Sequence, residues 1–273
     1  MEEDRVLEAS RKAEQLTEEE NCMEALQLAG QIIMENGGET YRAEETICRM
    51  GEGFGLSEVE SFVVPSGLFI SFRTGEGQLE TSVRRVHRKG TNLSRVDEVN
   101  QVSRQTAAGK MAPAEALARL REIQHAHGPV STAFSLLAAG LCAGGFSCLF
   151  GGNLPEIGIS FLIATLVQGV TVGAAMLHDH GIGANILGGL MTSLLANLTL
   201  LMIPGIRVEI LIASALMPMV PGVAMTNAVQ DTLRGDMVSG LSCAAQALLT
   251  ACLIAGGALV SPYLLRLIQG GVR

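Results

Sequence analysis

The residues whose types and spacing could carry chemistry gather around a break in one apolar run of the chain. Pro218, Pro221 and Gly222 interrupt the run that begins at Val208. Proline removes a helical hydrogen bond and glycine weakens a helix, so the break exposes backbone groups that lipid cannot satisfy. It lies about 15 Å along the run, near the middle of a bilayer core about 30 Å thick. Such a break is typical of transporter sites for substrates and ions, although a structural kink packed against a neighbouring helix gives the same pattern.

Polar side chains follow the break at positions where they could serve such a site. We expect Asn227 to offer its side-chain amide to a substrate or to the exposed backbone. Asp231 and Asp236 place carboxylates at the end of the run, where an acid is costly unless it is paired or hydrated. Asp231 is therefore predicted to gain and lose a proton, or to pair with an arginine, during ion coupling, and Asp236 is a further candidate.

Three more groups are candidates for the same pathway. Gln168 and Gln246 lie about 16 and about 14 Å into their own apolar runs, so both could face the break or simply hydrogen-bond another helix. His178, Asp179 and His180 close the second apolar run, where a histidine beside a carboxylate could accept a proton, with an ordinary polar loop as the alternative. No further ligands accompany these histidines at a suitable spacing, so we expect neither a metal site nor a cofactor.

The elements that must position these residues are indicated by the distribution of charge. The first 128 residues hold 15 of the 19 Lys and Arg and 22 of the 27 Asp and Glu, and the remaining residues contain several apolar runs long enough to span a bilayer. We predict an α-helical polytopic membrane protein with about five transmembrane helices and an N-terminal cytoplasmic α/β domain. The predicted domains are 1–128 and 129–273, and the predicted spans are 130–150, 157–177, 183–203, 208–229 and 237–261.

The N-terminal domain shows the patterns of both helices and strands. A capping-box start at Thr17 precedes a helical apolar face that Gly37-Gly38 stops, and Thr40 is expected to cap a second helix. Short segments rich in β-branched and aromatic residues predict three antiparallel strands. The further elements are a helix at 41–50, strands at 59–64, 67–72 and 79–86, and helices at 94–107 and 113–126.

Small residues recur at helical spacing in the apolar half. Gly140 and Gly144, Gly169 and Gly173, and Ala184 and Gly188 each stand four residues apart, which places them on one helix face. This pattern predicts close helix contacts, within one bundle or between copies of the chain.

Composition also excludes several classes of function. No nucleotide-binding loop, serine-hydrolase elbow or H-E-x-x-H motif occurs, so the chain is not expected to be an enzyme. The net charge of −8 argues against nucleic acid as a partner. The first 25 residues carry acids without an apolar core of a signal peptide, so we expect an inner (plasma) membrane protein whose N-terminal domain stays in the cytoplasm.

The residues after the break carry a family resemblance. Pro221-Gly222, Thr226-Asn227-Ala228, Asp231 and Gly235-Asp236 are similar to the P-G-x-x-x-T-N-A-x-x-D-x-x-x-G-D stretch of the threonine/serine exporter family. The segments 38–45 and 62–72 also resemble that family's N-terminal module. The resemblance implies export, driven by an ion gradient, of small amino acids such as threonine and serine or, in two-component members, of succinate. Because the chain shows no second hydrophobic module after Arg273, it resembles the split form and a second small membrane subunit is expected.

A different class of function competes with this one. The N-terminal domain could bind a metabolite as a sensor or regulator while the apolar helices serve as its membrane anchor. Five runs with a break at the middle of one exceed what an anchor needs, which favours transport. The substrate stays open, because an amino acid and a dicarboxylate both present a carboxylate to a helix N-terminus.

Overall fold

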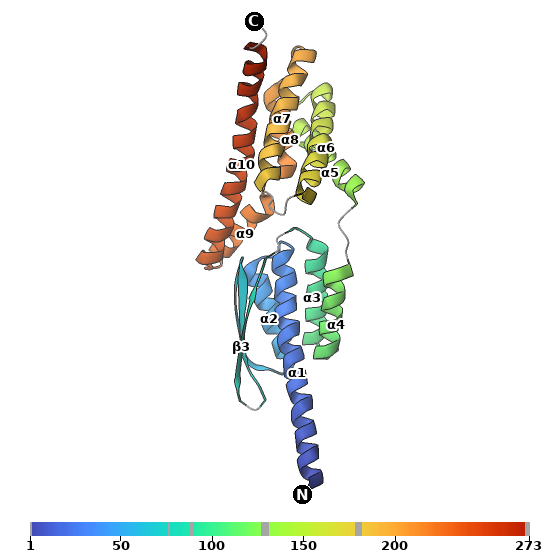
Figure 1. Ribbon diagram of the computed structural model, residues 1–273, viewed down its shortest axis with the longest axis vertical. Coiled ribbons are helices and arrows are strands. Elements are labelled where there is room, and N and C mark those ends of the chain that lie inside the picture. The colour runs from blue at the N-terminus through green and yellow to red at the C-terminus, as the bar shows by residue number, and fades with distance from the viewer. Residues whose placement is uncertain (1, 76, 88–89, 127–130, 178–181, 271–273) are drawn as a thin grey trace. The chain divides into compact units, whose positions relative to one another are not determined.

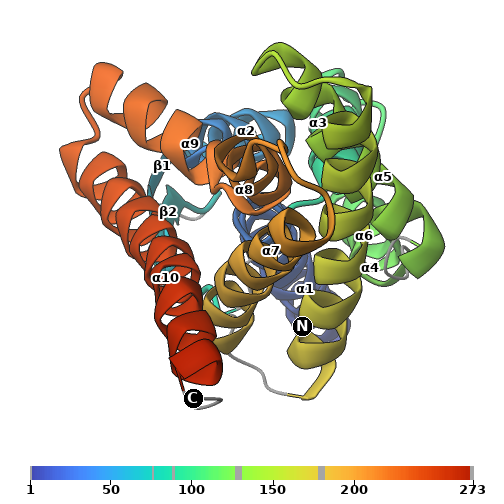
Figure 2. The ribbon, with the colours of Figure 1, turned by 90° about the horizontal axis from the view of Figure 1, so that it is seen from above.

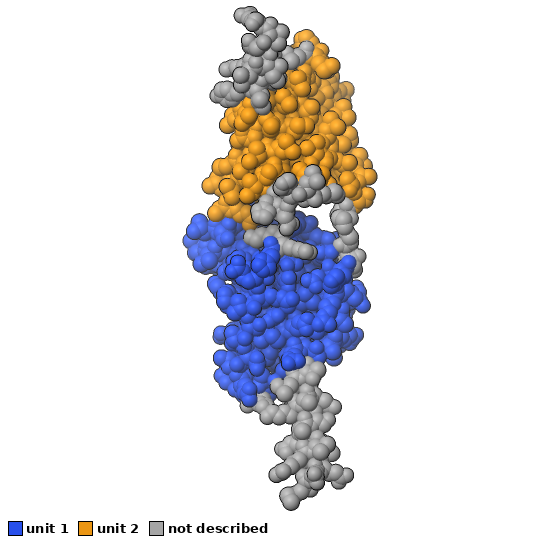
Figure 3. Space-filling model, viewed as in Figure 1, with its two compact units in different colours: residues 1–128, 223–244 blue, residues 129–222, 245–273 orange. Residues whose placement is uncertain are grey.

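The computed structural model describes residues 2–75, 77–87, 90–126, 131–177 and 182–270 (Figure 1). They form two compact units. Unit 1 comprises residues 1–128 and 223–244, and unit 2 comprises residues 129–222 and 245–273 (Figure 3). Residues 223–244 thus group with the N-terminal segment, whereas the sequence analysis divided the chain once, after residue 128.

Unit 1 contains a helical layer. Its helices are α1 (Glu2–Glu35), α2 (Thr40–Gly53), α3 (Leu93–Ala107), α4 (Pro113–Ala126), α9 (Gly222–Leu233) and the first turns of α10 (Met237–Gly270). The predicted start at Thr17 is wrong, because α1 begins at Glu2. The residues upstream of Thr17 are mostly Glu, Ala, Leu, Lys and Arg, which favour helix and supply no stop signal. Helix α1 ends at Glu35, just before the predicted stop at Gly37-Gly38. Gly37 has a φ of +85°, a conformation that favours glycine.

The predicted cap of the second helix is also corrected. Thr40 is the first residue of α2, and Glu39 occupies the capping position without a side-chain hydrogen bond to the helix. A threonine hydroxyl that does not cap its own helix is available for other partners. Thr40 uses it for contacts with residues far along the chain, described below.

The three predicted strands are confirmed. β1 (Ser57–Val64), β2 (Gly67–Arg73) and β3 (Leu79–Arg85) form an antiparallel sheet in the order β1-β2-β3. Alternate residues of the strands point to opposite faces. Leu68, Ile70 and Phe72 are buried in the core of the unit, together with Leu26 and Ile33 of α1.

Unit 2 is a bundle of apolar helices. It contains α5 (Thr132–Leu149), α6 (Leu154–Leu177), α7 (Ile182–Met202), α8 (Val208–Leu216), the 3₁₀ helix η1 (Met217–Met219) and the remainder of α10. Helices α5 to α8 pack on one another (Figure 2). Four helices are long and apolar enough to cross a membrane, or five if the interrupted pair 208–219 and 222–233 counts as one span. The chain is thus a multi-pass helical membrane protein, as predicted.

Small residues permit the closest helix contacts in unit 2. A side chain at Gly140 would meet Thr165 and Phe161, and one at Gly188 would meet Met219, which confirms two of the predicted small-residue faces. In the third motif, a side chain at Gly169 would contact Leu136 of α5, whereas Gly173 has open space around it.

A close approach of two backbones in unit 2 depends on glycines outside these motifs. A Cβ atom at Gly189 would meet the carbonyl of Ile254, and one at Gly257 would meet the carbonyl of Ile186. The two glycines therefore let α7 and α10 approach each other backbone to backbone, a pairing that the sequence analysis did not identify.

Candidate functional site

The predicted break is present and has a defined backbone. Pro218 lies in η1, and Val220 is extended with φ −61° and ψ 130°. Pro221 follows, and Gly222 is the first residue of α9. The N–H of Gly222 donates to the carbonyl of Val220 at 2.8 Å, which closes a tight turn at the break. The apolar run is thus divided into two short helices, α8 and α9, as the prolines indicated.

Helix α9 directs its polar residues toward the N-terminal elements of unit 1. Asn227 and Asp231 stand four residues apart and therefore share one face of the helix. Asn227 Nδ2 donates to the carbonyl oxygen of Gly37 at 3.2 Å. Met225 and Val229 of the same helix are exposed. The side-chain amide of Asn227 thus contacts the backbone of the connection between α1 and α2, whereas the contact expected from the sequence was with a substrate or with the backbone of the break.

Thr40 brings together two of the predicted acids. Its hydroxyl donates to Asp231 Oδ1 at 2.8 Å, and the same oxygen lies 3.3 Å from Asp236 Oδ2. Only 1% of the surface of Asp231 and of Thr40 is exposed. The second carboxylate oxygen of Asp231, Oδ2, is buried and has no hydrogen-bond partner in the described part of the chain. The partner of Asp231 is therefore a threonine of α2, whereas the sequence analysis considered an arginine.

A tight connection between α9 and α10 holds the two carboxylates in place. Gly235 adopts a φ of +94°, and the N–H of Asp236 donates to the carbonyl of Asp231 at 2.9 Å. Asp236 then caps α10, because its Oδ1 accepts a hydrogen bond from the N–H of Ser239 at 3.1 Å. The side chain of Ser239 donates to the carbonyl of Val63 at 3.3 Å, which joins α10 to β1.

A third acid, Glu44, lies in the same region. Glu44 Oε1 accepts a hydrogen bond from the N–H of Val63 at 2.8 Å. Burial raises the pKa of Glu44 above its ordinary value, the bond from Val63 lowers it, and the charges of Asp236 and Asp231 raise it further. No Lys, Arg or His side chain within the described ranges forms an ion pair with Glu44, Asp231 or Asp236.

The nearby arginines are engaged elsewhere. Arg42 Nε donates to Glu39 at 2.7 Å, and the guanidinium of Arg234 lies 3.5 Å from the centre of the Tyr41 ring. Burial acts to raise the pKa of Glu39, but the hydrogen bonds from Arg42 and the charges of Arg42 and Arg234 outweigh it, so this pKa is lowered. The positive charge of these two arginines therefore stabilises Glu39 as an anion, and neither arginine forms an ion pair with Glu44, Asp231 or Asp236.

The remaining predicted side chains belong to unit 2 or lie outside the described residues. Gln168 lies in unit 2 and donates to Ser135 Oγ at 3.0 Å, the helix-to-helix contact considered as its alternative role. Gln246 is exposed on the part of α10 that belongs to unit 2. The segment His178, Asp179 and His180 lies outside the described residues.

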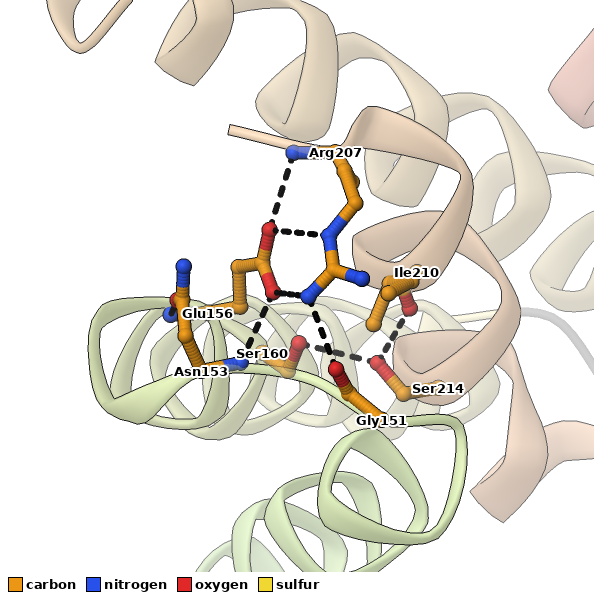
Figure 4. A network of polar contacts seen from close by, with 7 residues as sticks. All are labelled: Gly151, Asn153, Glu156, Ser160, Arg207, Ile210 and Ser214. Carbon is orange, nitrogen blue, oxygen red and sulfur yellow. Dashed lines mark hydrogen bonds and ion pairs between the residues drawn. The ribbon is translucent and has the colours of Figure 1, made fainter. Parts of the chain in front are cut away.

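Sequence reasoning missed a second polar network, in unit 2 (Figure 4). Glu156, which has no exposed surface, accepts hydrogen bonds from the backbone N–H and Nε of Arg207 at 3.0 Å each and from its Nη2 at 2.6 Å. Nη2 also donates to the carbonyl of Gly151 at 2.7 Å. A reciprocal capping box joins Glu156 to Asn153, and the Asn-x-x-Glu spacing was the signal available in the sequence.

This second network ties the ends of two helices together. Arg207 precedes α8 and Glu156 lies in the first turn of α6, so the ion pair connects the starts of these helices. One step further in, the hydroxyl of Ser214 donates to Ser160 at 2.8 Å (Figure 4). Every polar atom of the Glu156 carboxylate thus has a donor, which is the arrangement of a structural clamp.

Fold and site together define a multi-pass membrane protein in which a broken apolar helix carries a buried acid. A family model described as "Putative threonine/serine exporter" matches residues 24–265, and the chain belongs to this family. The predicted resemblance is therefore confirmed. A relative from Escherichia coli (strain K12), named "Probable succinate transporter subunit YjjP", is 25% identical over 215 residues, which cover 78% of this chain and 82% of the relative. No solved structure matches the chain.

Proposed function

We propose that the protein is a subunit of a secondary exporter for small hydrophilic carboxylates, either amino acids of the threonine and serine type or succinate. The observation that carries the proposal is the segment after the break, in which the buried carboxylate of Asp231 follows a proline-interrupted helix and forms no ion pair with a described residue. A buried acid of this kind in a membrane protein is costly to retain and is characteristic of ion-coupled transport. Membership of the exporter family and the named function of the relative support the same reading.

The proposed pathway passes the break between η1 and α9. Pro218 and Pro221 interrupt the helix, and the start of a helix that follows such a break can receive the carboxylate of a substrate. The N-terminal domain lies in the cytoplasm in this proposal, and the protein resides in the inner membrane. A Val223→Cys variant without the native cysteines should react with a small polar thiol reagent if the break is wet; a dry, lipid-facing break would leave it unlabelled.

A second membrane subunit belongs to the proposal. The relative is named a subunit, and transporters built from paired repeats need two matching modules around one site. We expect the chain alone in liposomes to export labelled threonine or succinate poorly, and to gain activity when coexpressed with a small membrane protein that supplies the second module.

The decisive experiment measures efflux from preloaded liposomes under an imposed pH gradient. Glu209→Gln is a matched control, because Glu209 is an exposed acid at the start of α8 and touches none of the residues of the site. Gradient-dependent efflux that persists in the control and is lost with Asn227→Ala supports an exporter. Full efflux by the chain alone would refute the need for a partner, and metabolite binding to unit 1 without any efflux would favour the sensor.

A further inference from the structure

Thr40, Asp231 and Asp236 form a cluster, the Thr40 cluster, in which one hydroxyl faces two acids. One hydroxyl lies 2.8 Å from an oxygen of Asp231 and 3.3 Å from an oxygen of Asp236, and a hydroxyl carries a single proton. If both acids are ionised, Thr40 can donate to only one of them, and its oxygen then faces the other carboxylate without a hydrogen between them. If one acid is protonated, its O–H donates to Thr40 and Thr40 donates to the other acid, so one added proton satisfies both contacts.

The buried oxygen of Asp231 is an independent observation that points to the same ligand. Asp231 is 99% buried, since only 1% of its surface is exposed, and its Oδ2 has no partner among the described residues. An ionised carboxylate with an unsatisfied buried oxygen is far more costly than a neutral carboxyl group in the same place. One proton bound to the pair of acids removes one negative charge, which lowers the cost of burying the unsatisfied Oδ2, and it needs no movement of a side chain.

The charges that face the cluster favour proton binding as well. Asp236 at the start of α10 and Glu39 and Glu44 of the α2 region act on it with negative charge. On the same elements, Arg42 is hydrogen-bonded to Glu39 and Arg234 of α9 lies over a tyrosine ring. Neighbouring anions disfavour a second ionisation in a pair of acids.

We propose that Asp231 and Asp236 bind one proton in common and that Thr40, supplied by the N-terminal domain, is the positioning residue that joins the two acids. Gly235 provides the turn that brings both carboxylates to the same hydroxyl, so the proton site is built from α2, α9 and the cap of α10. Releasing the proton removes the hydrogen bond between the Thr40 hydroxyl and one of the two acids. Proton occupancy and the contact between α2 and α9 are therefore thermodynamically linked.

The inference rests on the proposed function, which assigns ion coupling to Asp231, and adds the second acid and the hydroxyl of the proton site; its test needs no transported substrate. The test is an infrared titration of the purified full chain in detergent, which detects the C=O band of protonated carboxyl groups from about pH 5 to about pH 9. A band that persists well above the ordinary range of carboxylic acids, and that is lost in both Asp231→Asn and Asp236→Asn, is the expected result. Asp97→Asn, which removes an exposed acid of α3, should leave the band unchanged.

The role of Thr40 has its own comparison. Thr40→Val keeps the shape and removes the hydroxyl, so the band should disappear about one pH unit lower, a tenfold loss of proton affinity. Thr40→Ser restores a hydroxyl and should recover the wild-type titration, which also controls for misfolding of the valine variant. The absence of any high-pH carboxyl band in the wild-type protein, or a valine variant that titrates like wild type, would overturn the proposal. Failure of efflux in the liposome assay would not affect it, since no substrate is present here.

Discussion

The two polar networks of this protein are both built around a buried carboxylate, but they differ in how many of its hydrogen bonds are satisfied. In unit 2, Glu156 receives hydrogen bonds at both carboxylate oxygens and pairs with Arg207. In unit 1, Asp231 shares one hydroxyl with a second acid and keeps an unsatisfied oxygen. Buried polar groups in native proteins are nearly always satisfied, and among the buried atoms of the described residues that lack a hydrogen bond, Asp231 Oδ2 is the only carboxylate oxygen. We expect the Glu156 network to stabilise the fold and the Thr40 cluster to take part in function.

The largest change in stability should come from breaking the complete network. Arg207→Ala leaves the Glu156 carboxylate buried without its cation, and we expect the midpoint of thermal unfolding in detergent to fall by about 5 to 10 °C. The double variant Glu156→Gln with Arg207→Met should recover much of the loss, because it leaves no uncompensated charge. An Arg207→Ala variant as stable as wild type would erase the contrast between the two networks.

A smaller loss of stability is expected at Asn227. Asn227→Ala removes the hydrogen bond to the Gly37 carbonyl, worth about 1 kcal/mol, and should lower the unfolding midpoint by about 2 to 4 °C. Export should nevertheless be abolished while membrane abundance stays normal, as shown by efflux and immunoblotting. Wild-type efflux at normal expression would remove Asn227 from the pathway.

Asp231→Asn sharpens the comparison most directly, because stability and function should separate. The amide removes a buried ionisable group that lacks one partner, so the unfolding midpoint should stay within about 2 °C of wild type or rise. Gradient-driven export should be lost. If the variant exports with the pH dependence of the wild-type protein, Asp231 is only an acid at a helix end.

The smallest effect concerns Glu44 and pH. Its pKa is raised in the folded protein, so its contribution to stability is fully present below the unfolded pKa of about 4.3 and is lost as the pH rises through the folded value. Unit 1 should therefore become slightly more resistant to unfolding on mild acidification. Thermal melts at several pH values should show a weaker trend in Glu44→Gln; an identical trend in both proteins would assign the effect to other groups.

Local patterns in the sequence predicted most of the elements and the break. The strands, the apolar helices and the interruption at Pro218 and Pro221 follow from propensity, length and missing backbone donors. The bond between Thr40 and Asp231 joins residues 191 positions apart, and no local signal specifies such a pairing. Thr40 even carried a misleading signal, since a threonine before an acidic helix start is also the pattern of a cap.

Unit 2 shows the same limit in a different form. The capping box of Asn153 and Glu156 was visible in the sequence, but the choice of Arg207 as the partner depends on how α6 and α8 pack. For Gln168, the sequence predicted how far along its helix the residue lies. It did not predict the direction in which the side chain points from that helix, which is toward Ser135. The direction of a side chain around its helix depends on tertiary packing, which explains why Asp231 and Asp236 were identified from the sequence and their partner Thr40 was not.

The glycine contact between α7 and α10 determines where this chain can vary. Gly189 and Gly257 each face a backbone carbonyl of the opposite helix, so even alanine would push the two helices apart, whereas Gly145 and Gly173 have open space around them. The 32 glycines of the chain are therefore unequal in mutational tolerance. Among natural or random variants that retain a folded protein, substitutions should accumulate at the open positions and be depleted at Gly189 and Gly257, although neither of these glycines lies in a polar network.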